Sequence, residues 1–106
     1  MHTNRTDLVE DLNRLMAEEA EASLRYLQMR FRLRGRGRRT AEKFFETALK
    51  ETLEHAEAIG KQIRALGHVP ALRIDLTLNA DPMHPEEALA EALEVVTAHV
   101  PLVLVL

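Results

Sequence analysis

The sequence predicts an all-α fold in which an antiparallel helix hairpin is followed by a third, shorter helix. Three observations predict it. Leu, Ala, Glu and Arg dominate the 106 residues, and all four favour helix. Apolar residues recur at steps of three and four along two long segments. Two glycines interrupt residues 34–39 between those segments, and a linker this short makes two helices antiparallel neighbours.

The first predicted helix spans about residues 6–33. A second apolar stripe on this helix, distinct from the main one, predicts a contact with another subunit, because a helix with two apolar faces packs against more than one neighbour. That second stripe contains Met16, Ala20, Leu24, Leu27 and Phe31. The main apolar stripe consists of Leu8, Leu12, Leu15, Ala22, Tyr26, Met29 and Leu33.

The second predicted helix spans about residues 40–66. Thr40 is expected as its N-cap, and Gly67 is expected to end it, with Pro70 following shortly after. Residues 68–83 lack a regular pattern and predict a long connection over the surface.

The third predicted helix spans about residues 85–99, with Pro85 in its first turn and Pro101 as its stop. The apolar segment 102–106 that follows has no polar alternation. The whole chain, residues 1–106, has the length of one helical domain.

Composition excludes several classes of function. There is no cysteine, which excludes thiolate metal sites and Cys nucleophiles and fits a reducing cytoplasm. The net charge of −3 predicts no general attraction to nucleic acid. No apolar run approaches the roughly 18 residues needed to span a bilayer, so no membrane contact is expected.

Candidate chemistry comes from polar residues on the inward stripes. Glu19 interrupts the main stripe of the first helix, and His55 interrupts that of the second. Burying a lone carboxylate is costly unless it is paired, so these positions predict a shared pocket from which water is excluded. Glu51 lies four residues before His55, on the same face.

The hairpin places these residues at one level. Glu19 lies about 17 residues before a turn centred near position 36, and positions 51 and 55 lie about 15 and 19 residues after it. Two carboxylates and an imidazole suit iron, manganese or zinc. One hairpin supplies only about half of the ligands of a bundle di-metal site, so the rest must come from the third helix, from residues missing here, or from a second subunit. A second subunit would complete a four-helix bundle and the site together.

Three stretches resemble the bacterioferritins of the ferritin-like family. Residues 13–26, NRLMAEEAEASLRY, resemble the first helix of that family, where a core glutamate precedes a tyrosine by seven residues. Residues 54–57, EHAE, resemble its second-helix segment, and the spacing from Tyr26 to His55 fits without a gap. Residues 65–70, ALGHVP, resemble the turn that follows. The likeness covers about residues 8–70.

The resemblance implies iron binding, with Glu19 and His55 as ligands, and oxidation of Fe(II) by O₂ in cage-forming storage proteins. The bridging glutamate of the family corresponds to Thr52, and a carboxylate is present one residue earlier, at Glu51. The haem-ligating methionine of the family corresponds to Leu53, so no haem is expected. We therefore predict an iron site formed by Glu19, Glu51 and His55 in a homo-oligomer of at least two chains.

Two other interpretations stay open. In the first, the chain is a metal-free oligomerisation module that has kept the helix bundle but lost metal binding. Thr52 at the bridging position and the missing fourth helix both favour it. In that case Glu19 is a stripe-edge residue, and His55 is a hydrogen-bonded core residue. The remaining candidate is nucleic-acid binding by the basic turn, which we disfavour because no aromatic residues interleave with the arginines. That turn contains Arg30, Arg32, Arg34, Arg36, Arg38 and Arg39.

Overall fold

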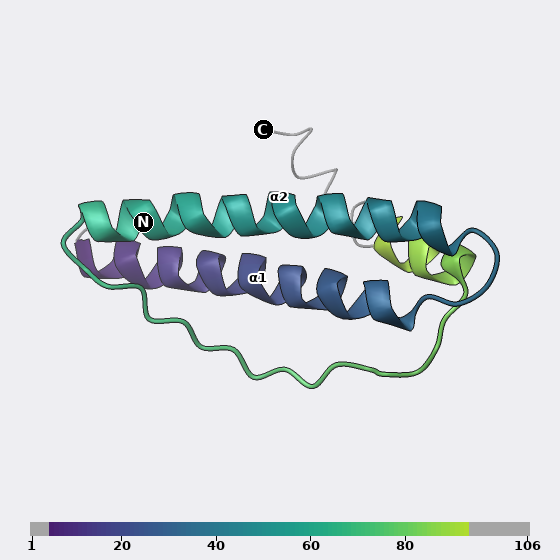
Figure 1. The fold of residues 1–106 in the computed structure, drawn as a ribbon. Helices are drawn as coiled ribbons and strands as arrows, with labels where there is room; N and C mark the ends of the chain where they lie inside the picture. Colours follow the sequence, from purple (N-terminus) through teal and green to yellow (C-terminus); the bar gives the residue numbers. More distant parts are fainter. Residues whose placement is uncertain (1–4, 94–106) are drawn as a thin grey trace.

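The computed structural model describes residues 5–93, with side chains described from Asp7 onward. Helix α1 spans Arg5–Arg32 and helix α2 spans Arg38–Ala65, and a third helix occupies residues 85–93. The two long helices pack antiparallel along their whole length (Figure 1). The predicted all-α hairpin with a third helix is confirmed. The predicted extension of the third helix to residue 99 and the apolar segment 102–106 lie outside the described residues.

Glycine in the left-handed region starts α2. Gly37 has a φ of 84° and is the N-cap, without a side-chain capping bond. Its carbonyl accepts the N–H of Ala41 at 3.1 Å, the first helical bond. Thr40, predicted as the cap, therefore lies inside the first turn. The sequence suggested a hydroxyl cap, but Gly37 reverses the chain three residues earlier, because glycine alone adopts this φ without a steric penalty.

The other end of α2 follows the prediction. Gly67 has a φ of 88°, and its N–H donates to the carbonyl of Arg64 at 2.9 Å. The N–H of His68 donates to the carbonyl of Ile63 at 3.2 Å. These two bonds form a Schellman motif, which satisfies the last carbonyls of the helix. Gly67 is confirmed as the residue that ends α2.

Residues 68–82, which we call the strap, run back along α1 from the end of α2 to the turn (Figure 1). Side chains of α1 hold both ends of the strap. Asn13 accepts the N–H of Ala71 at 3.0 Å, and Gln28 donates to the carbonyl of Asn79 at 3.1 Å. Beyond the strap, Leu33 and Met83 form a parallel bridge. The predicted long surface connection is confirmed.

The apolar core lies at the turn end of the hairpin. The third helix packs there against α1 and α2, bringing Ala88 and Ala92 onto Phe45. Phe45 is 1% exposed, and the ring of Tyr26 lies 6.0 Å from it, centroid to centroid. The buried residues of this cluster are Leu33, Ala41, Phe45, Ala88 and Ala92.

Several arginines of the turn support the fold. The guanidinium of Arg34 donates to the carbonyls of Phe31 and Leu33, at the negative end of the α1 dipole. Arg32 donates to the carbonyl of Asp81 at 2.8 Å and so fastens the strap. Among the described residues, none of the helices is both long and apolar enough to cross a membrane.

Candidate metal centre

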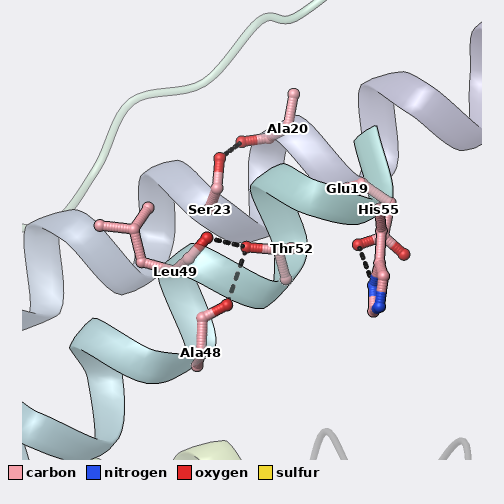
Figure 2. Close-up of polar contacts among 7 residues, drawn as sticks. All are labelled: Glu19, Ala20, Ser23, Ala48, Leu49, Thr52 and His55. Atoms are coloured by element: carbon pink, nitrogen blue, oxygen red, sulfur yellow. Dashed lines mark hydrogen bonds and ion pairs between the residues drawn. The ribbon is translucent and has the colours of Figure 1, made fainter. Parts of the chain in front are cut away.

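Glu19 of α1 and His55 of α2 meet across the hairpin. Nδ1 of His55 lies 3.4 Å from Oε2 of Glu19 (Figure 2). The antiparallel register that the sequence suggested therefore places these two side chains at one level. Ligand atoms about 2.1 Å from a divalent metal, in tetrahedral or octahedral geometry, lie about 3.0 to 3.4 Å apart. The separation of this carboxylate and imidazole therefore fits two neighbouring ligands of one metal ion.

The pair is open to water. The side chain of His55 is 64% exposed and that of Glu19 is 32% exposed. The expectation of a pocket from which water is excluded is therefore wrong for the described residues. The physical reason is that the third helix packs at the turn end, so no other element covers this side of the middle of the hairpin among the described residues. An exposed pair of this kind contributes little to folding stability, since water screens its charges.

Two hydroxyl residues lie next to the pair on the facing sides of the helices (Figure 2). Ser23, one turn along α1 from Glu19, is 3% exposed and donates to the carbonyl of Ala20 at 2.6 Å. Thr52, one turn before His55, contacts the carbonyls of Ala48 at 3.0 Å and Leu49 at 2.9 Å. The middle of the hairpin is therefore polar on both helices, and each hydroxyl is satisfied by its own helix.

Glu51 does not join the pair in this arrangement. Its side chain is exposed, and residues 5–93 contain no group of three or more acidic, histidine or cysteine side chains arranged to hold a metal ion. Thr52 occupies the position where the resemblance places a bridging carboxylate, and its hydroxyl is engaged with helix carbonyls. One hairpin thus brings together two side chains, a carboxylate and an imidazole, of the types that can bind a metal ion.

The sequence of this chain matches a known protein family. A family model described as the ferritin-like domain matches residues 9–103, which is most of the chain. The chain belongs to the ferritin-like family. Bacterioferritin, the subgroup suggested by the sequence, is a finer assignment that this match does not make. A search of curated proteins and a search of solved structures each gave no match.

In this ferritin-like chain, Ser23 is the residue of the site that sequence reasoning missed. It falls one turn after Glu19 and directly after Ala22, which belongs to the predicted inward stripe, so no break in that stripe marks it. Leu53, where the resemblance would place a haem-ligating methionine, is 47% exposed. It lies two residues before His55, which is about 200° around the helix and so on the other side of the hairpin.

Tyr26 lies outside the Glu19–His55 pair, toward the turn. It lines a cavity of about 120 Å³ between α1, α2 and the third helix, together with Met29, Phe45 and Ala88. The cavity wall is mostly apolar, so Tyr26 acts here as a packing residue with one side facing an open space.

Proposed function

We propose that this ferritin-like protein binds iron through Glu19 and His55, with Glu51 as a further carboxylate nearby. The observation that carries the proposal is the 3.4 Å approach of the Glu19 carboxylate to the His55 imidazole across the hairpin. A carboxylate and a neutral imidazole suit Fe(II), and a negatively charged ligand set favours Fe(III) over Fe(II). Iron is the substrate here, oxidised by O₂ and stored.

A complete site needs ligands from outside one hairpin. Two hairpins that face each other across a two-fold axis would form a four-helix bundle and bring together two copies of the pair. The exposure of His55 supports this proposal, because the side of the hairpin that carries the pair is free to receive a partner. The lack of cysteine fits a reducing compartment such as the cytoplasm.

The experiment is an anaerobic Fe(II) titration, followed by metal analysis and by the absorbance change on admitting air. We expect at least about one iron per two chains, because two copies of the pair make one four-ligand site. Glu19→Gln and His55→Gln should each abolish this binding. Glu18→Gln and His68→Gln are the matched controls, since both side chains are exposed and neither faces the pair, and they should leave binding unchanged.

A metal-free oligomerisation module is the second candidate. The specific observation that favours it is Thr52, whose hydroxyl contacts two helix carbonyls at the position of the family's bridging carboxylate. Under this alternative, the titration gives less than about one iron per two chains, and no absorbance develops in air.

A further inference from the structure

The basic turn concentrates the positive charge of the chain. Residues 22–41 contain seven arginines and no acidic residue, whereas the rest of the chain holds seven basic and 17 acidic residues. A block of one sign creates a local positive potential even in a chain whose net charge is −3. Such blocks are typical of surfaces that bind anions. The mild overall acidity therefore does not describe this end of the molecule.

Little of this charge is neutralised within the fold. Among the described residues, the only ion pair of a turn arginine joins Arg38 to Glu42, with Nε and Oε1 3.8 Å apart. The guanidinium of Arg34 donates to main-chain carbonyls, which accept hydrogen bonds but do not cancel its charge. Arg36 and Arg39 are exposed, and their side chains have no hydrogen bond or ion pair in the part of the chain that the structure describes. The turn therefore presents guanidinium groups that an external anion can reach.

The surface is hollowed beside these arginines. A depression of about 380 Å³ is lined by Gly35, Gly37, Arg38, Arg39 and Thr40. Both glycines have a positive φ, 94° and 84°, which side-chain-bearing residues rarely adopt, so the main chain stays accessible there. Guanidinium groups beside an open main chain suit a phosphate group, which the planar fork of arginine binds through two hydrogen bonds.

An exposed aromatic ring lies among the arginines. Phe31 stands between Arg30 and Arg32 and is 68% exposed. Cζ of Arg30 lies 5.7 Å from the centroid of the Phe31 ring. Phe31 is thus the interleaved aromatic residue that sequence reasoning missed, and it removes the ground on which nucleic-acid binding was disfavoured. Aromatic rings beside cationic groups are the surfaces on which unpaired bases stack.

The ring and the arginines of α2 share one side of the hairpin. Met16 marks that side, because a Cβ added at Gly60 would lie 3.0 Å from its Cε. At about 100° per residue, Phe31 lies about 60° from Met16 around α1, and Arg38 lies about 40° from Gly60 around α2. His55 lies about 140° from Gly60, so the carboxylate–imidazole pair uses another side of the hairpin.

We propose that the basic turn binds single-stranded nucleic acid. The phosphates of the strand bind Arg36, Arg38 and Arg39, and an unpaired base stacks on Phe31. Every base has a π face, so this site accepts strands without a strong sequence preference. Neither Glu19 nor His55 takes part, so binding of a strand does not depend on iron.

Other polyanions fit the turn less well. A duplex keeps its bases stacked on each other, so it offers phosphates to the arginines but no free base face to Phe31. A bilayer of anionic lipid takes up apolar side chains below its charged surface. Residues 34–40, which form the tip of the turn, are only arginine, glycine and threonine. A flexible single strand is therefore the partner that uses both the charge and the ring.

Binding of labelled single strands in the presence of a chelator tests the phosphate contacts. Oligothymidine and oligouridine of about 12 nucleotides should both raise the fluorescence anisotropy on binding. Their affinity should fall about twentyfold between about 50 and about 200 mM salt, because three arginine–phosphate contacts each release about 0.7 counterion. The triple variant Arg36→Ala, Arg38→Ala, Arg39→Ala should lose most of this affinity and of its salt dependence. It should still fold, because cations at the positive end of the α2 dipole are unfavourable.

The matched control is the triple variant Lys50→Ala, Lys61→Ala, Arg64→Ala. It removes the same charge from exposed positions of α2 beyond the turn, and it should retain wild-type affinity. Equal losses in the two triple variants would mean that net charge alone attracts the strand, and a wild-type protein that binds neither oligonucleotide would refute the proposal. The arginine variant should bind iron as the wild type does, which keeps this test separate from that of the proposed function.

Substitution of the ring tests base stacking. Phe31→Ala should weaken binding of the single strand about tenfold or more at unchanged salt dependence, and Phe31→Trp should restore it. Phe44→Ala is the control, since Phe44 is 45% exposed and lies about 160° from Gly60 around α2. Unlabelled duplex should compete at least about tenfold less well than the single strand, and phosphatidylglycerol vesicles should not compete. Full affinity in Phe31→Ala, or equal competition by duplex or by vesicles, would overturn the assignment of a single strand.

Discussion

The two halves of the hairpin differ in what fills the space between α1 and α2. At the turn end, Phe45 is 1% exposed and Leu33 is fully buried, and the third helix covers both. In the middle, the facing residues are Glu19 and His55, followed by Ser23 and Thr52 (Figure 2). One region buries apolar surface under a third element, whereas the other keeps polar groups and stays open.

The residues that stabilise the fold therefore differ from the polar residues that could bind a metal ion. Burial of a large aromatic side chain stabilises a fold by several kcal/mol, whereas an exposed carboxylate–imidazole contact adds little. The middle of the hairpin therefore holds its geometry mainly because the ends are packed, at the turn by the Phe45 cluster and at the other end by Val9 and Ile63. The polar side chains of such a region can change without loss of the fold.

The largest expected effect is on the free energy of unfolding and tests whether the packed turn end stabilises the fold. Phe45→Ala should lower the free energy of unfolding by about 3–5 kcal/mol, because it leaves a cavity beside the existing 120 Å³ space. Phe44→Ala is the matched control, since Phe44 is 45% exposed, and should cost about 1 kcal/mol. Urea unfolding followed by circular dichroism measures both. Similar losses for the two variants would show that the turn end is not the main source of stability.

The sequence was sufficient to predict the hairpin and the level of its site. The periodic apolar stripes and the paired glycines of the turn determine two antiparallel helices, and counting residues from the turn then places Glu19 beside His55. Gly67 was predictable as the end of α2 because a left-handed residue there is nearly always glycine. These features depend on local spacing, which a sequence records directly.

The exposure of the Glu19 and His55 side chains to water cannot be predicted from the sequence in the same way. Whether water reaches His55 depends on where the third helix packs, and that follows from tertiary contacts of Ala88 and Ala92 with Phe45 rather than from any pattern around His55. The N-cap was misassigned for a similar reason, because Thr40 is a good capping residue but the backbone of Gly37 decided the start of α2. Ser23 is not predictable from the stripes because it lies between Ala22 of one stripe and Leu24 of the other, and its burial follows from how α1 packs on α2.

A second variant tests the middle of the hairpin. Thr52→Glu adds a carboxylate where the resemblance to bacterioferritins places a bridging ligand, in the same polar layer as Glu19. Without metal, it should lower the free energy of unfolding by about 1 kcal/mol, because like charges are brought together. With Zn(II), which takes the same ligands without redox chemistry, stability should recover, and metal affinity should rise about tenfold or more.

Thr47→Glu is the control for this test, since Thr47 is exposed on another side of α2. It should change neither metal affinity nor the effect of Zn(II) on the melting temperature. A Thr52→Glu protein that binds Zn(II) no better than the wild type would mean that position 52 does not face Glu19 and His55, and the proposal that the open middle of the hairpin binds metal would lose its support.

The smallest expected effect concerns Ser23, the most buried polar side chain of the middle layer. Its hydroxyl donates only to the carbonyl of Ala20, within the same helix. Ser23→Ala removes the donor but leaves that carbonyl in the helical hydrogen-bond ladder, and alanine favours helix more than serine does. The free energy of unfolding should therefore change by less than about 0.5 kcal/mol. A loss above about 2 kcal/mol in urea unfolding would mean that the hydroxyl links the two helices, and the middle of the hairpin would then carry stability as well as chemistry.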